Sequence, residues 1–212
     1  MINHALQFLI EAVFGLALWV VLARFWLQVW RAPFQNPIGQ FLMAASDWAV
    51  KPLRRQLGGR GGYDWACLLL AWLVAFVLQW LSLQLHPLLG LVAADALLLG
   101  AMLLAVVKLA ASTVSLVLWA CIVQALLSWV NPYTPLAPVL DACTRPFLRP
   151  LQQRLPSLGG LDLPPLVLIL LCQLVQMLPL AWLEAQIFNG MFVQSDPFDW
   201  FLEPSASSFF DF

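Results

Sequence analysis

Charged residues are scarce in this sequence of 212 residues: Lys, Arg, Asp and Glu make up 10% of the chain, whereas hydrophobic residues make up 62%. A soluble domain usually contains about 25% charged residues, so the composition excludes an ordinary soluble domain and indicates a polytopic membrane protein. No basic region suited to binding nucleic-acid phosphates is present. The first ten residues contain no Lys or Arg, so we expect the first hydrophobic run to be retained as a span rather than cleaved as a signal peptide.

Residues that usually carry catalysis or bind metals are also few. The two histidines, His4 and His86, lie near the ends of predicted spans, and no phosphate loop, paired-carboxylate site or metal-ligand spacing occurs. The four cysteines form no Cys-x-x-Cys pair, and three lie within apolar runs, where a thiol usually behaves as a small hydrophobic side chain. The sequence therefore predicts a protein that is not an enzyme and has no cofactor, metal site or disulfide framework.

Long hydrophobic runs are what the sequence has in abundance. A spanning helix needs about 20 mostly apolar residues, and four runs qualify: Ala5–Trp30, Trp65–Leu85, Leu109–Val130 and Leu166–Phe188. A fifth run, Leu88–Val107, is also about long enough, but Pro87, Gly90 and Gly100 are placed to break or bend it. We therefore expect an all-α membrane protein.

The chain contains an internal duplication with an offset of 98 residues, in which each copy runs as span, polar segment and span. Within each polar segment, apolar residues recur at i, i+3, i+4 and i+7, which predicts an amphipathic helix lying along the membrane surface. The matching positions are Ile38, Phe41, Leu42 and Ala45 in the first copy and Leu136, Val139, Leu140 and Cys143 in the second.

Each polar segment, residues 31–64 or 131–165, is called an elbow below. We expect Pro52 and Pro150 in the first turn of a second short helix, because a missing N–H is tolerated there. The basic residues around these prolines are expected to contact anionic lipid headgroups or a protein partner; they are Lys51, Arg54, Arg55, Arg149 and Arg154.

The end of each elbow carries the signals of a helix start. A Gly-Gly pair permits a tight turn with positive φ, and the aspartate that follows is expected to cap the next span by accepting hydrogen bonds from its free N–H groups. Pro164 and Pro165 fit the first turn of the last span. The predicted capping motif comprises Gly61, Gly62 and Asp64 in the first copy and Gly159, Gly160 and Asp162 in the second.

The distribution of basic residues predicts the topology. Five of the ten Lys and Arg residues lie in the first elbow and three in the second, so the positive-inside rule places both elbows in the cytoplasm of a bacterial cell, in a multi-pass inner-membrane protein. Two elbows on one side require an even number of crossings between them. We therefore expect four spans, with Leu88–Val107 as one re-entrant or fifth hydrophobic segment. The predicted division of the chain is a first repeat (1–86), a connecting segment (87–108), a second repeat (109–188) and an acidic, aromatic tail (189–212).

Ionisable residues within hydrophobic runs are the remaining candidates for function, because charge in hydrocarbon is unfavourable. They are Glu11, Arg24, Asp95, Lys108 and Glu184. Arg24 lies about two turns from the cytoplasmic end of its run, so its side chain can extend to the interface. One hypothesis is that Glu11, Asp95 and Lys108 form a small paired polar cluster that lines an ion path; the alternatives are structural pairing and simple exposure.

Several short motifs carry a resemblance to a known family. In the second copy they are Ser128-Trp129-Val130, Thr144-x-Pro146-x-Leu148-Arg149-Pro150, Leu155-Pro156-x-x-Gly159-Gly160-x-Asp162 and Pro165. In the first copy they are Asn36-Pro37, Lys51-Pro52-Leu53-Arg54-Arg55 and Gly61-Gly62-x-Asp64. With these motifs the chain resembles the YggT family of bacterial integral membrane proteins, which has plastid relatives. It departs from the family pattern at Arg145, where an acidic residue is usual.

The resemblance implies a non-enzymatic membrane protein, since relatives have been linked with osmotic-stress tolerance, with cell division and shape, and in plastids with cytochrome assembly. Two functions stay open. The first is a membrane scaffold or assembly/accessory factor that binds anionic lipids and a membrane-protein partner or a second copy of itself. The alternative is an ion channel or transporter component with a polar path between the two repeats.

Overall fold

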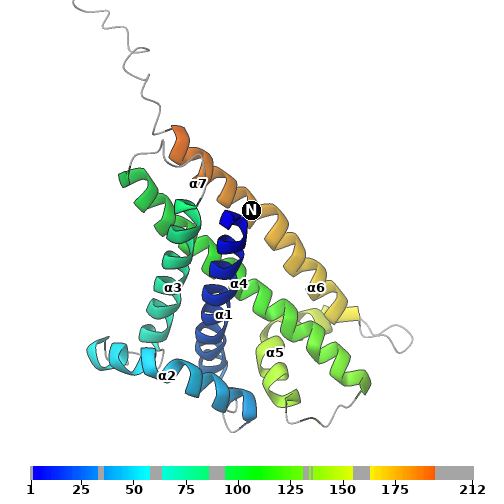
Figure 1. Cartoon of the computed structure of the whole chain (residues 1–212). Coiled ribbons are helices and arrows are strands. Elements are labelled where there is room, and N and C mark those ends of the chain that lie inside the picture. The colour runs from blue at the N-terminus through cyan, green and yellow to red at the C-terminus, as the bar shows by residue number, and fades with distance from the viewer. Residues whose placement is uncertain are drawn as a thin grey trace, which may run out of the picture.

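The fold was analysed in a computed structural model that describes residues 2–32, 36–57, 64–85, 94–130, 134, 136–154 and 163–193. Nearly all of these residues lie in helices (Figure 1). The elements are α1 (Ile2–Val29), α2 (Pro37–Leu57), α3 (Trp65–Gln84), α4 (Ala94–Val130), α5 (Ala137–Arg154), α6 (Leu163–Val175), a π-helical turn η2 (Gln176–Leu180) and α7 (Ala181–Val193). The prediction of an all-α protein is confirmed.

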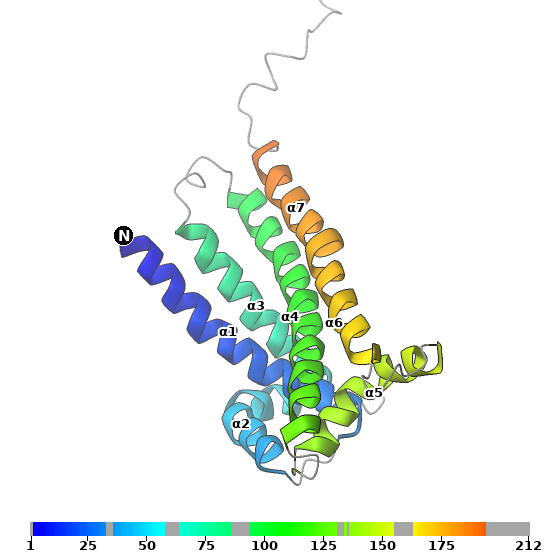
Figure 2. The same cartoon turned by 90° about the vertical axis from the view of Figure 1, so that its right-hand side faces the viewer.

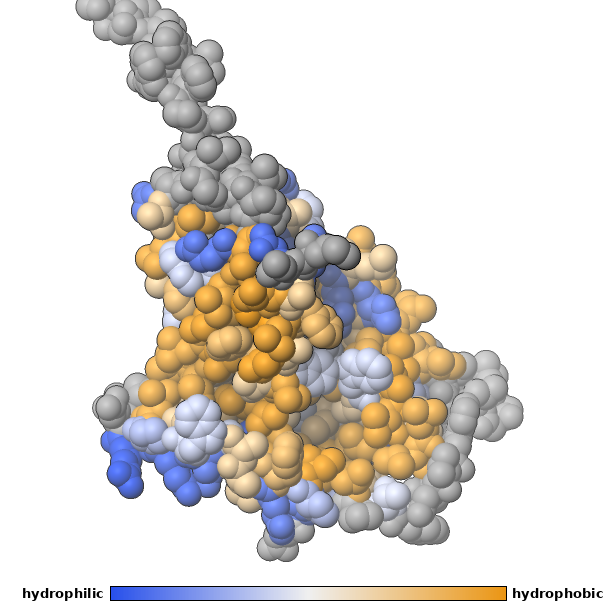
Figure 3. Space-filling model, viewed as in Figure 1, coloured by the Kyte–Doolittle hydropathy of each residue, from blue (hydrophilic) through white to orange (hydrophobic). Residues whose placement is uncertain are grey.

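Within the described residues, four helical rods are long and apolar enough to cross a membrane, which agrees with the predicted four spans. They are α1, α3, α4 and the continuous rod of α6, η2 and α7. The amphipathic helices α2 and α5 lie together at one end of the rods, whereas the N-terminus and the end of α7 lie at the other (Figures 1 and 2). Hydrophobic residues cover the sides of the rods, and hydrophilic residues gather at the α2 end (Figure 3).

The core lies where α1, α3 and α4 meet. Leu18 and Leu22 of α1 pack against alanines of the other two helices, and the buried members include Ala71, Ala75 and Ala105. Small residues let helix backbones approach closely, and close packing drives helix association in lipid, where apolar burial contributes little. Cys67, Cys121 and Cys172 are buried as free thiols, as the apolar surroundings predicted.

The structure corrects the expectation for Leu88–Val107. Its described part, from Ala94 onward, is not a separate re-entrant segment but the beginning of α4, which continues without a break to Val130. Gly100 does not end this helix; instead, its missing side chain makes room for Met191 of α7. Because one helix replaces two segments, the number of crossings between the elbows is even, as the topology requires.

A second expectation was wrong in detail. Pro52 and Pro150 do not begin new short helices, because α2 and α5 run through them as single helices, and α5 also contains Pro146. An internal proline removes one backbone hydrogen bond. On a surface helix the freed carbonyl can be solvated by water or headgroups, so the helix continues. Pro164 and Pro165 do lie in the first turn of α6, as predicted.

Candidate functional site: two anchored amphipathic helices

The first amphipathic helix is anchored to α1 by a buried arginine. Arg24 is only 7% exposed, and its Nη1 donates hydrogen bonds to Ser46 Oγ at 2.7 Å and to Asp47 Oδ1 at 2.8 Å. Lys51 Nζ lies 2.8 Å from the other carboxylate oxygen of Asp47. Arg24 therefore extends toward the elbow end of α1, where the carboxylate of Asp47 on α2 compensates its charge.

The ion pair affects the acidity of Asp47. Hydrogen bonds from Lys51 and Arg24 stabilise the carboxylate and hold the pKa of Asp47 below its ordinary value of 3.8. Asp47 is therefore ionised at neutral pH, and the contact between α1 and α2 is charged on both sides.

The second amphipathic helix is anchored in the same way by a neutral contact. Thr144 of α5 stands 98 residues after Ser46 of α2, and both side chains are buried. Each hydroxyl donates to the backbone carbonyl four residues earlier, Ser46 to that of Leu42 and Thr144 to that of Leu140. Thr144 also forms a hydrogen bond with the side chain of Gln124 on α4. The corresponding partner of Ser46 is Arg24 on α1.

These anchoring residues were missed by the sequence analysis, although a signal was present. Ser46 and Thr144 occupy position i+8 of the two apolar stripes, where a polar residue is unexpected on a face that packs against a span. A buried hydroxyl in that position requires a partner. The identity of the partner, Arg24 or Gln124, depends on how the helices pack.

Asp64 does not have the predicted capping role. Its side chain makes no capping hydrogen bond at the start of α3; instead, Oδ2 lies 2.8 Å from Arg54 Nη2 in an ion pair, and Asp64 is 4% exposed. Its backbone carbonyl accepts from the N–H groups of Cys67 and Leu68. The pair attaches the end of α2 to α3. Gly61, Gly62, Gly159, Gly160 and Asp162 lie outside the described residues.

The Arg54–Asp64 pair leads to a prediction. Replacing Arg54→Met is expected to destabilise the protein by about 1–2 kcal/mol, because Asp64 stays buried without its cation; the loss is smaller than for a fully buried pair, since Arg54 is half exposed. Unfolding in mixed micelles measures the change. Arg55→Met is the matched control, because Arg55 is the exposed neighbour and no ion pair is seen for it among the described residues. Equal losses in the two variants would contradict the role of Arg54.

The predicted basic surface is present at the elbow end of the molecule. All five residues are exposed: Lys51, Arg54, Arg55, Arg149 and Arg154. Lys51 and Arg54 also take part in the ion pairs described above, whereas among the described residues the other three form none. Trp48 of α2 is 80% exposed beside them. The surface combines cations and an aromatic ring, a combination typical of helices that lie at a lipid interface.

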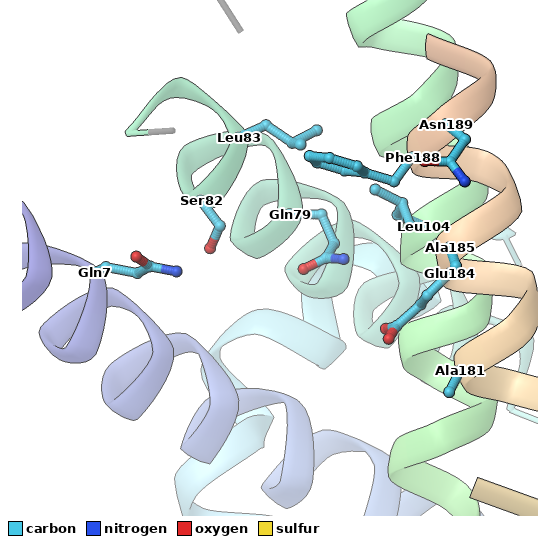
Figure 4. Close-up of a pocket in the computed structure, with 10 residues that line it drawn as sticks. All are labelled: Gln7, Gln79, Ser82, Leu83, Leu104, Ala181, Glu184, Ala185, Phe188 and Asn189. Carbon is cyan, nitrogen blue, oxygen red and sulfur yellow. The ribbon is translucent and has the colours of Figure 1, made fainter. Parts of the chain in front are cut away.

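The predicted cluster of Glu11, Asp95 and Lys108 is not formed. Glu11 accepts a hydrogen bond from Gln7 at 3.2 Å on the exposed face of α1, and no salt bridge among the described residues includes any of the three. A different polar site lies near the end of the rods away from the elbows, in a pocket of about 490 Å³. Figure 4 shows Gln7 on α1, Gln79 and Ser82 on α3 and Glu184 on α7 around it.

Comparison with known proteins places the chain in a family. The CCB3/YggT family matches residues 3–85 and again residues 103–183, so both copies of the duplication are covered. The chain belongs to the CCB3/YggT family. The two matches start and end near the predicted limits of the repeats, 1–86 and 109–188, whose exact boundaries stay a prediction.

Individual members of the CCB3/YggT family are similar over most of their length. The chain is 38% identical to "Uncharacterized protein in proC 3'region" of Vibrio alginolyticus over 79% of this chain and 89% of that protein. It is 35% identical to "Uncharacterized protein PA0392" of Pseudomonas aeruginosa, covering 84% and 89%. It is 32% identical to "Uncharacterized protein YggT" of Escherichia coli K12, covering 82% and 88%. No solved structure matches this CCB3/YggT chain.

Proposed function

We propose that this protein is a non-enzymatic inner-membrane scaffold or assembly/accessory factor. The observation that carries the proposal is the anchoring of α2 and α5 at one end of the spans through Ser46 and Thr144. Buried polar contacts hold the two helices in defined positions, so that each helix presents its basic residues at a fixed place at the elbow end of the spans. A rigid surface of this kind suits the recruitment of lipids and of another membrane protein.

The proposed orientation has both elbows in the cytoplasm, because of their excess of basic residues. Anionic headgroups on that side attract the basic surface, with about 1 kcal/mol for each Lys or Arg near the membrane. The proposed partners are anionic lipids together with a membrane protein or a second copy of this chain. The process served is proposed to be osmotic-stress tolerance or cell-envelope and division events, on the basis of the YggT resemblance.

The test is purification of the chain from native membranes in a mild detergent, with mass spectrometry of the proteins that co-purify. We expect a reproducible membrane-protein partner, and we expect the Arg55→Glu/Arg154→Glu variant to recover less of it because the basic surface is reversed in sign. The matched control is Arg55→Lys/Arg154→Lys, which keeps the charge. Recovery of the chain alone, as a defined oligomer without a partner, would contradict a scaffold that recruits other proteins.

The alternative function, a component of an ion channel or transporter, is favoured by the polar pocket near the other end of the rods. Its polar residues come from both copies, since Gln7 and Gln79 belong to the first and Glu184 to the second. Ion flux in reconstituted vesicles distinguishes the two functions. A flux that falls in Glu184→Gln but not in the Arg55→Glu/Arg154→Glu variant would support transport.

A further inference from the structure

Two pockets lie next to each other along α5, and they differ in chemistry. The first, of about 440 Å³, is lined by the end of α1 and the exposed side of α5, and it contains Arg31, Arg145 and Arg149 together with one acidic residue, Asp141. The three arginines outnumber the single carboxylate. Since all three arginines are exposed and no salt bridge among the described residues includes them, the pocket presents uncompensated positive charge.

The second pocket, of about 470 Å³, is apolar and lies between α4, α5 and α6. Val117 and Leu171 are among its lining residues, and Pro146 of α5 lines both pockets. Trp30 of the basic pocket and Phe147 of the apolar pocket meet edge to face, with ring centroids 6.1 Å apart. The two pockets therefore adjoin, with Pro146 and the Trp30–Phe147 contact between them.

The duplication shows that the arginine pair Arg145 and Arg149 is a feature of α5 and not of α2. Asp47 and Lys51 in α2 correspond to Arg145 and Arg149 in α5 at the offset of 98 residues. In α2, Asp47 pairs with both Lys51 and Arg24, so each of these two cations has a carboxylate partner within the protein. In α5 two arginines stand four residues apart on one helix face, where like charges repel. An anion from outside the protein would remove this repulsion.

Arg31 is held at the basic pocket by an unfavourable backbone conformation. Its φ is 53°, in the left-handed region where a helix usually ends with glycine. The N–H of Arg31 donates to the Gln28 carbonyl at 3.2 Å and that of Ala32 to the Leu27 carbonyl at 2.9 Å, which closes α1. A glycine would make the same turn without strain, so the backbone gives no reason for an arginine here.

We propose that the basic pocket and the adjoining apolar pocket together form a binding site for one anionic phospholipid of the cytoplasmic leaflet. Its phosphate contacts Arg31, Arg145 and Arg149, and an acyl chain lies in the apolar pocket between α4 and α6. The site rests on the proposed function in one respect, that the elbows face the cytoplasmic leaflet. It goes beyond that function by assigning a defined lipid to the second elbow, where charge and apolar volume meet.

The test measures lipid binding to the purified full chain by native mass spectrometry. The probes are dioleoyl phosphatidylglycerol and dioleoyl phosphatidylcholine, which share their acyl chains and differ in headgroup charge. We expect a preference for phosphatidylglycerol that weakens about fivefold for each arginine removed in Arg145→Gln and Arg149→Gln. Arg154→Gln is the comparison variant. Arg154 belongs to the basic surface on α5 but lines neither pocket, so its removal should weaken the preference less than the removal of Arg145 or Arg149.

The apolar pocket is tested with a matched pair on α6. Leu171 and Leu174 are 44% and 43% exposed, but only Leu171 lines the pocket. Leu171→Trp is expected to fill it and lower the binding of phosphatidylglycerol, whereas Leu174→Trp leaves binding unchanged. The wild-type chain provides a check that needs no folded variant, because dihexanoyl phosphatidylglycerol, with short chains, is expected to bind more weakly than the dioleoyl lipid.

Four results would overturn the site. The first is equal binding of the two dioleoyl lipids. The second is equal binding of the short-chain and long-chain phosphatidylglycerols, and the third is the same effect from both tryptophan variants, because in either case charge alone would explain the attraction. The fourth is full competition by inorganic phosphate, which would indicate a site for a free anion. Since binding is measured on the isolated chain, it is independent of partner recovery and separates failure of this site from failure of the scaffold.

The variant Arg31→Gly separates lipid binding from folding. It removes one charge of the basic pocket and also relieves the backbone strain at the end of α1. We expect weaker binding of phosphatidylglycerol together with a lipid-free stability that is equal or higher. Unchanged binding would contradict the place of Arg31 in the site.

Discussion

Replacing Asp47→Ala is expected to lower the melting temperature of the purified protein on the order of ten degrees, because Arg24 then stays buried without its carboxylate. Removing the other partner is expected to have a much smaller effect. In Arg24→Met the carboxylate of Asp47 keeps Lys51 and is partly exposed, so no isolated charge is left in the interior. Thermal unfolding in detergent, followed by tryptophan fluorescence, measures both variants.

The double variant Arg24→Met/Asp47→Ala is the control for this prediction. Exchanging a buried ion pair for apolar side chains is often neutral, so we expect it to recover most of the stability lost in Asp47→Ala alone. If the losses of the two single variants simply added in the double variant, the buried pair would not be the cause.

Acid provides an independent check on the same contact. The pKa of Asp47 is lower in the folded protein than its ordinary value of 3.8, so the stabilisation is present at pH values above 3.8 and is lost as the pH falls through the lowered folded-state pKa. We expect wild-type stability to fall on acidification below that value. The variant Asp47→Asn should lack this part of the acid dependence.

Replacing Gly100→Leu is expected to destabilise the protein by about 1–3 kcal/mol through overpacking between α4 and α7. A side chain on Gly100 would overlap the sulfur of Met191, which is buried among Leu83, Ala96, Ala101 and Leu104. Met191 is flexible, but its side chain is surrounded by the other members of this cluster and has too little free space to move away from an added leucine. Unfolding in mixed micelles measures the loss.

Gly190→Leu is the matched control, because it also replaces a helical glycine in the same region and nothing lies within 4 Å of an added Cβ there. We expect its stability to be close to that of the wild type. Similar losses in the two variants would mean that glycine-specific packing at Gly100 does not hold α7 against α4.

Much of the architecture could be predicted from the sequence because its signals are local. Each of the four spans is a continuous apolar run, and each amphipathic helix shows its stripe within about two turns. The start of α6 at Pro164 and Pro165 was also readable, because proline has a fixed φ and no N–H. Local predictions failed at Pro52 and Pro150, at Asp64 and at Gly100, where more than one local outcome was compatible with the residues.

The amino-acid sequence by itself determined the all-α membrane class, the duplication and the basic elbows, because hydrophobicity, periodicity and charge act over short stretches of chain. Only the tertiary structure decided which charges meet. Arg24 pairs with Asp47 across 23 positions, and Arg54 pairs with Asp64 in place of a helix cap. It also decided that α4 is one helix and that a basic and an apolar pocket adjoin on α5. The physical reason is that pairing and pocket formation depend on how helix faces pack, and each face admits several partners until close contact selects one.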